Sequence, residues 1–197
     1  QEVLTMRLTR TVGPAAPPIT VEEAKPHSRM DFGHEDDLFA AWIDTAVDLL
    51  DGPTGMLGRA IVRQEWLLEL TAWPGAIVLP VEPVLSVAVA YLDQDGAEQD
   101  VDVGMTWLQR APGMAAELHF ASGFTQPALS ASDPFPVRIT MVCGFGDAAD
   151  VPPAIKMAIK MMVEHWHEHR GVVVTGAIIA EIPMSAQALL GRWRRVL

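Results

Sequence analysis

The chain has 197 residues, 50% of them hydrophobic and 20% charged, so it is long and apolar enough to bury a core. Its formal net charge of −11 excludes a surface built to grip nucleic acid phosphates. Its one cysteine, Cys143, excludes an internal disulfide, and no apolar run reaches the ~20 residues of a membrane span.

The N-terminus, residues 1–18, is interpreted as an extended arm. Residues 11–18, TVGPAAPP, are rich in proline, which fixes φ and removes hydrogen-bond donors. The sequence T-V-E-E then begins at Thr20. It is typical of a capping box, in which Thr20 accepts the N–H of Glu23 and the Glu23 carboxylate reaches back. A short helix is therefore predicted after Thr20.

The first long helix is predicted over residues 34–51. Its apolar residues recur at spacings of four, three and four in two adjacent rows, which indicates one broad buried stripe. These rows are Leu38, Trp42, Thr45 and Leu49, and beside them Phe39, Ile43, Ala46 and Leu50. The opposite face carries Asp37, Asp44, Asp48 and Asp51. Two interpretations stay open for these aspartates: a solvated face, or a face that repels an anionic molecule.

The middle of the chain changes to the period of β-strands, and an antiparallel β insertion is predicted at about residues 60–146. The expected strands are residues 61–70, 77–79, 84–92, 101–103, 107–110, 117–121 and 137–142. The sequence D-Q-D-G at 93–96 predicts a hairpin turn. Residues 122–136 are expected to form a long irregular loop, and loops of that length are usually functional or mobile.

The last third of the chain is predicted to be helical again. Pro152 and Pro153 are typical of a helix start, and Gly171 is expected to end this helix. A core stripe with spacings of four, three and four is formed by Ile155, Ile159, Met162 and Trp166. A further helix is predicted at about residues 185–195.

Three histidines close together, in MVEHWHEHRGVVV, raise the question of a metal enzyme. On a helix His165 and His169 share one side, whereas His167 points to nearly the opposite side, so the three cannot bind one metal. The zinc-protease pattern H-E-x-x-H would need a histidine at position 171, which is Gly171. The favoured interpretation is structural, because histidine suits a helix C-terminus. The alternative is a metal-dependent hydrolase that uses His165, His169 and a distant carboxylate.

Other chemical patterns are equally incomplete. Cys143 has no base at a recognisable spacing, so a small buried strand residue is expected there. The sequence G-F-G at 144–146 lacks the third glycine of a dinucleotide loop. No catalytic residue, metal ligand or cofactor is therefore predicted, and the chain is not expected to be an enzyme.

The C-terminal sequence GRWRRVL is a candidate docking segment. Residues 152–197 hold six basic and three acidic residues, which gives this end a charge of +3 on an acidic chain. A basic end with an exposed aromatic suits an anchor in a partner's groove, although a frayed solvated terminus is the alternative. The partner-binding candidates are Arg192, Trp193, Arg194, Arg195 and Leu197.

An ordered set of short sequences resembles the head–tail connector (adaptor) proteins of long-tailed phages and phage-like gene transfer agents. The resemblance extends over roughly residues 18–190, and G-F-G-D-x-x-D-V-P-P is its most specific part. The sequences are PITVEEAK (18–25), Thr54 with Gly55, WLLEL (66–70), IVLPVEPVLSV (77–87), YLDQDG (91–96), VCGFGDAADVPPAIKMAI (142–159) and HWHEHR.

The resemblance implies an α+β fold, with a core of about four helices and the β insertion between the second and third. Residues 19–197 would then be one connector domain with a docking segment at about 185–197. It also implies a structural virion protein that forms a dodecameric ring beneath the portal. The ring would bind head-closure (stopper) or tail proteins and surround the DNA without binding it specifically. Such particles are assembled in the bacterial cytoplasm. The alternative within this class is another neck protein, a head-closure protein or a tail terminator.

Overall fold

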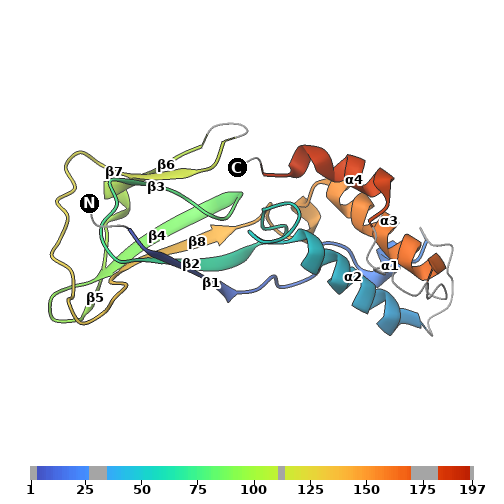
Figure 1. Cartoon of the computed structure of the whole chain (residues 1–197), viewed down its shortest axis with the longest axis horizontal. Helices are drawn as coiled ribbons and strands as arrows, with labels where there is room; N and C mark the ends of the chain where they lie inside the picture. Colours follow the sequence, from blue (N-terminus) through green and yellow to red (C-terminus); the bar gives the residue numbers. More distant parts are fainter. Residues whose placement is uncertain (1–3, 27–34, 111–113, 170–181, 196–197) are drawn as a thin grey trace. The chain divides into compact units, whose positions relative to one another are not determined.

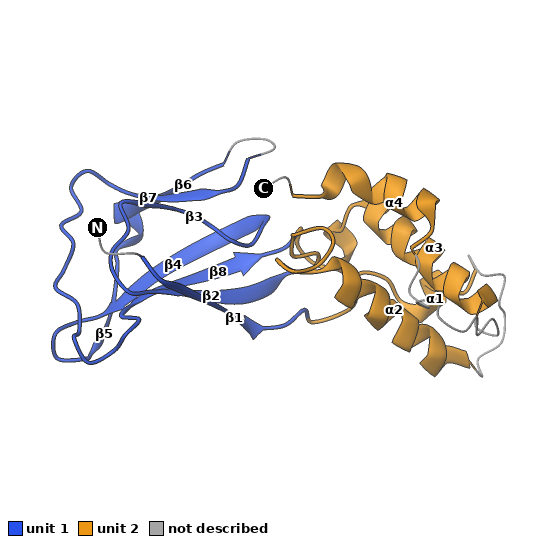
Figure 2. Cartoon of the chain, in the orientation of Figure 1, with its two compact units in different colours: residues 1–14, 63–144, 196 blue, residues 15–62, 145–195, 197 orange. Residues whose placement is uncertain are grey.

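The computed structural model describes residues 4–26, 35–110, 114–169 and 182–195 (Figure 1). It confirms the predicted α+β class, with helices and antiparallel sheets. The chain divides into two compact units (Figure 2). We call residues 1–14 and 63–144 the β unit, and residues 15–62 and 145–195 the helical unit.

The β unit contains two antiparallel sheets. The larger sheet has the strand order β1-β2-β8-β4-β5, and the smaller has the order β3-β7-β6. The larger sheet is built from β1 (Met6–Val12), β2 (Gln64–Leu70), β8 (Val137–Cys143), β4 (Val84–Leu92) and β5 (Glu98–Asp100). The smaller sheet is built from β3 (Ala76–Val78), β7 (Glu117–Phe120) and β6 (Thr106–Gln109). The central strand β8 buries alternate residues, Val137, Ile139, Met141 and Cys143, as the period of a strand requires.

Two sequence expectations for the β unit need correction. The expected N-terminal arm is extended, but residues 6–12 pair with β2, from Met6 opposite Leu70 to Arg10 opposite Trp66. They therefore form an edge strand of the larger sheet. The strand expected at 101–103 is also wrong, because β5 ends at Asp100 and a 3-10 helix, η2, covers Val103–Met105.

The predicted hairpin at D-Q-D-G is confirmed between β4 and β5. The Asp93 N–H donates to the Ala97 carbonyl at 2.9 Å. Gly96 has φ of 80°, a left-handed conformation that glycine adopts at no steric cost. The Asp93 carboxylate accepts the Gln99 side-chain amide and the Ala97 N–H, and these hydrogen bonds lower its pKa.

The helical unit packs its helices around one continuous hydrophobic core. The helices are α1 (Val21–Ala24), α2 (Asp36–Leu50), α3 (Pro153–His169) and α4 (Met184–Leu190), with 3-10 turns η3 (Ala148–Asp150) and η4 (Gly191–Trp193). Of the two apolar rows predicted on α2, only the second is fully buried: Phe39, Ile43, Ala46 and Leu50. The predicted α3 stripe, Ile155, Ile159, Met162 and Trp166, is buried throughout.

The helix starts agree with the local sequence signals. The capping box at α1 is confirmed, with the Glu23 N–H donating to Thr20 Oγ1 at 3.3 Å and the Thr20 N–H donating to Glu23 Oε2 at 3.1 Å. Helix α3 begins at the second of the two prolines, and the Pro152 carbonyl accepts the N–H of Ile155 at 2.9 Å. Within the described part of the chain, none of the helices is long and apolar enough to cross a membrane.

Candidate functional site

Helix α2 presents an acidic surface. Asp37, Asp44 and Asp48 are exposed, and they lie on the side away from the buried row that begins at Phe39. No basic residue occurs in this helix. We call these three aspartates the acidic face. Their carboxylates make a local negative potential that repels phosphate groups.

Asp51, the fourth aspartate predicted for this face, has a structural position instead. It follows the last residue of α2 and is only partly exposed. Its Oδ1 accepts the backbone N–H of Ile61 at 2.7 Å, which joins the end of α2 to the chain ten residues later. This carboxylate stabilises the fold, so we leave it out of the acidic face.

His167 lies between α3 and the start of α2, on the side opposite to the other two histidines, as the helical period predicts. Its Nε2 is 3.1 Å from Glu35 Oε2, and both side chains are largely buried. The imidazole contacts the rings of Phe39 and Trp42, with centroid distances of 5.3 and 5.5 Å. His167 therefore stabilises the packing of α3 on α2.

His165 and His169 lie together on the other side of α3. Their ring centroids are 4.2 Å apart, and His169 Nδ1 is 2.7 Å from the carbonyl oxygen of His165. Among the described residues, no three His, Cys, Asp or Glu side chains are grouped so that they could hold a metal ion. The distant carboxylate that the hydrolase alternative requires is not found in that part of the chain.

The C-terminal segment differs from the exposed aromatic anchor that the sequence suggested. Trp193 is half-buried and packs against the core of its own unit, with its ring at 90° to Phe145 and a centroid distance of 5.4 Å. The Arg59 Nε–H donates to the Trp193 carbonyl at 2.9 Å. The indole is thus part of the fold, and no local sequence pattern indicates that it turns inward.

The arginines of this segment have different surroundings. Arg192 and Arg194 are exposed, and the Arg192 guanidinium lies over the Trp193 ring at 5.0 Å. Arg195 is only partly exposed, and its backbone N–H donates to the Leu57 carbonyl at 2.8 Å. Leu197 lies outside the described residues. Arg192 and Arg194 are therefore the exposed basic residues that the described part of this segment offers to a partner.

The most specific part of the resemblance, G-F-G-D-x-x-D, has a local structural cause. Gly146 has φ of 130°, and a Cβ atom there would lie 2.9 Å from the Cβ of Asp150. Asp150 Oδ2 in turn accepts the Asp147 N–H at 2.9 Å and caps η3. Only glycine fits at position 146, so this sequence fixes the turn before α3 rather than a ligand site.

Cys143 is fully buried at the end of β8, as predicted for a small strand residue. Its thiol lies 3.6 Å from the Val81 carbonyl oxygen. Burial, with a smaller contribution from the charge of Glu82, raises the pKa of the thiol to about 12. The thiolate needed for nucleophilic catalysis is therefore disfavoured.

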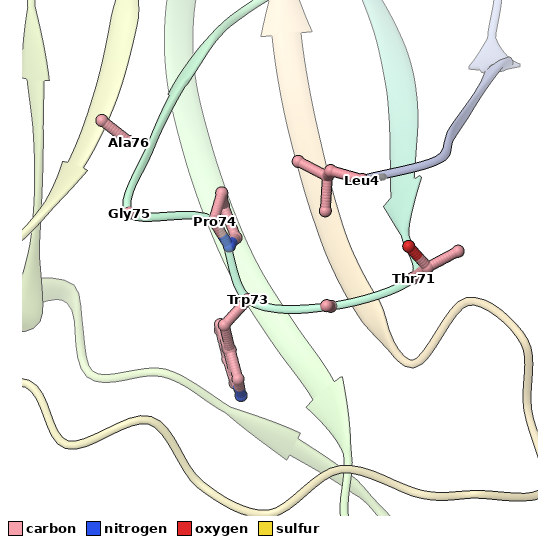
Figure 3. A pocket seen from close by; sticks show the side chains of 7 residues that line it. Leu4, Thr71, Trp73, Pro74, Gly75 and Ala76 are labelled. Atoms are coloured by element: carbon pink, nitrogen blue, oxygen red, sulfur yellow. The ribbon is translucent and has the colours of Figure 1, made fainter. Parts of the chain in front are cut away.

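One small pocket of about 380 Å³ lies in the β unit (Figure 3). It is lined by Leu4, Thr71, Ala72, Trp73, Pro74, Gly75 and Ala76. Thr71 contributes a hydroxyl, but none of the lining side chains is an acid or a base that could activate it, so the pocket offers no acid–base chemistry. Its tryptophan has a structural partner, because Trp73 Nε1–H donates to the Pro127 carbonyl at 2.9 Å.

The long loop at 122–136 is attached to the β unit through aromatic contacts. The Trp73 ring contacts Phe124 of this loop at a centroid distance of 5.2 Å, and Phe124 stacks on Phe120 at 4.8 Å. Tyr91 completes the cluster, 5.4 Å from Trp73. The sequence predicted the loop but gave no signal for these contacts.

Comparisons with known proteins find matches to the fold of this chain but not to its sequence. No family model matches the sequence, and no curated protein matches it. Solved structures do match. A chain from the neck of an empty GTA particle, computed with C6 symmetry, is 24% identical with a TM-score of 0.74, covering 97% of this chain and 96% of that one. The chain has the fold of a GTA neck protein.

Two further structures agree with this assignment of the fold. A chain from the virion of a native gene transfer agent particle has a TM-score of 0.73 at 24% identity, and covers 96% of each chain. A chain from the neck of a native GTA particle, computed with C12 symmetry, has a TM-score of 0.67 at 21% identity, over 97% of this chain and 96% of that one. The likeness therefore includes both units.

Proposed function

We propose that this chain is a head–tail connector (adaptor) protein of a phage-like particle. The observation that supports this most strongly is the fold shared with GTA neck chains over 97% of the chain. As such a protein, it forms a ring of identical copies, a dodecamer, beneath the portal at the head–tail interface. It joins the portal to head-closure or tail proteins and has a structural rather than an enzymatic role.

The proposed portal contact is the exposed basic part of the C-terminal segment, Arg192 and Arg194. Each guanidinium can bind a carboxylate with two parallel hydrogen bonds, which suits an acidic groove on the portal. The charge contrast supports this choice, because the chain as a whole carries a net charge of −11. The chemistry that we assign to this end is therefore electrostatic attachment.

The acidic face of α2 is proposed to border the DNA channel. Asp37, Asp44 and Asp48 would repel the phosphate backbone, so DNA could pass through the ring without binding to it. The test is to build particles with Asp44→Lys and Asp48→Lys, and to count the particles that deliver DNA. The matched control is Asp95→Lys with Glu168→Lys, which changes the charge equally at exposed positions elsewhere. Equal delivery by the two variants would remove the channel assignment.

The experiment for the function as a whole is native mass spectrometry of the protein mixed with the portal protein from the same gene cluster. We expect a portal complex that carries a fixed, ring-like number of copies. A chain that ignores the portal but binds a head-closure or tail-tube protein would assign it to another neck position. A monomer that holds one zinc ion would overturn the structural role.

The portal contact needs point variants, because deleting residues 185–197 would also remove Ala186 and Leu190 from the core. Arg192→Glu with Arg194→Glu changes the charge by the same amount as Lys156→Glu with Lys160→Glu on α3. We expect the arginine variant to lose the portal and the lysine variant to keep it. The same portal affinity for both would place the contact elsewhere.

A further inference from the structure

His165 and His169 form an ordered pair at the C-terminal end of α3. Side chains four residues apart on a helix lie on the same face, one turn above the other. The two ring centroids are 4.2 Å apart, with 38° between the ring planes, so the imidazoles lie against each other. His165 is partly exposed and His169 is exposed, so solutes can reach both rings. The pair therefore has the spacing at which two helical histidines can bind one metal ion.

A hydrogen bond sets the position of the hydrogen on the His169 ring. Its Nδ1 is 2.7 Å from the carbonyl oxygen of His165. That oxygen can only accept, so Nδ1 carries the hydrogen, and in the neutral imidazole the lone pair is left on Nε2. Histidines that bind metals usually donate their other ring N–H to a carboxylate or a backbone carbonyl in this way. His169 is therefore held in the tautomer of a metal ligand, with Nε2 as its donor atom.

His167, on the same helix, has the surroundings of a structural histidine. Its side chain is 13% exposed and its Nε2 lies 3.1 Å from the Glu35 carboxylate. Its ring also contacts Phe39 of α2. By contrast, the ring contact and the hydrogen bond that join His165 to His169 lie within α3 itself. The packing of α3 on α2 thus accounts for His167 but not for the order of this pair.

The local charge favours a cation at the pair. From Met161 to His169 the helix contains two glutamates, Glu164 and Glu168, and no lysine or arginine. Each glutamate directly precedes one of the two histidines, and Glu168 is exposed. The last carbonyl groups of a helix add the negative end of the helix dipole. A divalent ion at the pair therefore meets a negative potential.

The ligand set limits which ion can bind and what it can do. In the part of the chain that the structure describes, no third His, Cys, Asp or Glu completes a metal-binding group. The remaining coordination positions therefore belong to water. Imidazole nitrogen suits Cu²⁺, Ni²⁺ and Zn²⁺, whereas Mg²⁺ and Ca²⁺ prefer oxygen ligands. Catalytic zinc sites use three protein ligands, so two histidines indicate a structural ion rather than a catalytic one.

We propose that His165 and His169 bind one divalent transition-metal ion, with water as its other ligands. The ion joins two successive turns at the end of α3, where the last carbonyl groups have no partner within the helix. Binding therefore stabilises this end of the helix. The site goes beyond the proposed function, because a connector role requires no metal and this ion takes no part in catalysis.

Isothermal titration of the full-length, untagged protein with nickel chloride tests the site. Losing a histidine ligand should lower the nickel affinity by at least roughly tenfold, since the loss of an outer-shell partner alone has an effect of that size. We expect this loss in His165→Gln and in His169→Gln. The matched control is His119→Gln, which removes a partly exposed histidine of the β unit and should keep the parent affinity. Magnesium chloride should give no binding at the same concentrations.

The number of ligands is measured with copper. The electron paramagnetic resonance spectrum of the Cu²⁺-loaded parent should show two imidazole nitrogens, and each of the two glutamine variants should show one. Circular dichroism checks that the variants are folded. Equal nickel affinity in the parent and in both variants would overturn the site and indicate an adventitious ion only. A parent spectrum with a single imidazole nitrogen would also overturn it.

Hydrogen exchange measures the effect of the ion on the helix. Zinc should slow the exchange of backbone amides in the last turn of α3, because an ion that binds the folded site stabilises it. In His169→Gln the same amides should exchange equally fast with and without zinc. Equal slowing in the parent and in this variant would contradict a role of the pair in holding the end of α3.

Native mass spectrometry with the portal separates this site from the proposed function. The complex is prepared once with EDTA and once with nickel chloride. A ring on the portal in both samples, together with glutamine variants that bind nickel as tightly as the parent, would overturn the site and leave the function intact. No ring in either sample, together with nickel binding that depends on His165 and His169, would overturn the function and leave the site intact.

Discussion

The two units of the chain differ in how they treat apolar side chains. The helical unit encloses nineteen buried residues in one core, and only Leu38, Met157 and Met184 are exposed large hydrophobics among its described residues. The β unit leaves eight such residues exposed. The helical unit leaves little apolar surface for a partner, whereas a unit with exposed apolar side chains on its sheets is suited to contacts with other chains. The difference teaches that the β unit is the better place to look for self-association.

The strongest test of this contrast is a cavity in the helical core. Phe39 is completely buried, so Phe39→Ala should lower the free energy of unfolding by about 3–5 kcal/mol. The control is the preceding residue on the helix, Leu38, which is 37% exposed; Leu38→Ala should cost less than about 1 kcal/mol. Urea unfolding followed by circular dichroism measures both. An equal loss of unfolding free energy in the two variants would contradict the burial of Phe39 in this core.

A buried carboxylate of the β unit gives the next largest effect. Glu82 is buried, and its Oε1 accepts the Ala116 N–H at 2.8 Å. Glu82→Ala leaves that donor without this partner, which should cost about 1–3 kcal/mol. Hydrogen exchange should show the loss of protection confined to the β unit.

Glu82→Gln is the matched control, because its carbonyl oxygen can still accept the Ala116 N–H. We expect the glutamine variant to retain more stability than the alanine variant. The opposite order would mean that the charge of Glu82, rather than this hydrogen bond, stabilises the unit.

Local patterns predicted much of the helical unit. Helix α2 and helix α3 follow from the spacing of their apolar residues, and the turn at α1 follows from Thr20 and Glu23. These signals extend over a few residues, so the sequence shows them directly. The same holds for the hairpin at Gly96.

Long-range contacts could not be predicted in the same way. Strand β1 is exposed on nearly every residue, so it lacks the alternation that marks a half-buried strand, and its pairing depends on β2 more than fifty residues away. The sequence predicts an exposed anchor at Trp193, because no residue near it in the sequence indicates its contact with Phe145. The sequence could therefore indicate only which segments carry the candidate surfaces, the aspartates of α2 and the C-terminal arginines. The structure is needed to show which residues of these segments are exposed.

Asp51 and Asp48, at the C-terminal end of α2, test the difference between a carboxylate that stabilises the fold and one that is exposed. Asp51→Ala removes the acceptor of the Ile61 N–H and should cost about 1 kcal/mol or slightly more. Asp48→Ala changes an exposed carboxylate and should stay within about 0.5 kcal/mol of the parent. Thermal unfolding of both variants measures the difference. A larger loss at Asp48 would mean that the acidic face is structural.

The smallest effect at neutral pH is expected at Cys143. Its pKa of about 12 in the fold, against an ordinary value of 9.0, means that the thiol stays protonated in the native protein. The unfolded chain ionises first as pH rises, so the stability tied to this thiol is complete below pH 9.0 and is lost between pH 9.0 and about 12. Native protein at pH 8 should react with Ellman's reagent only as fast as the β unit opens, whereas an added Gln94→Cys should react at once. Rapid reaction of Cys143 itself would mean that the end of β8 opens to solvent, and a β unit that opens there would make a poor rigid element for a ring.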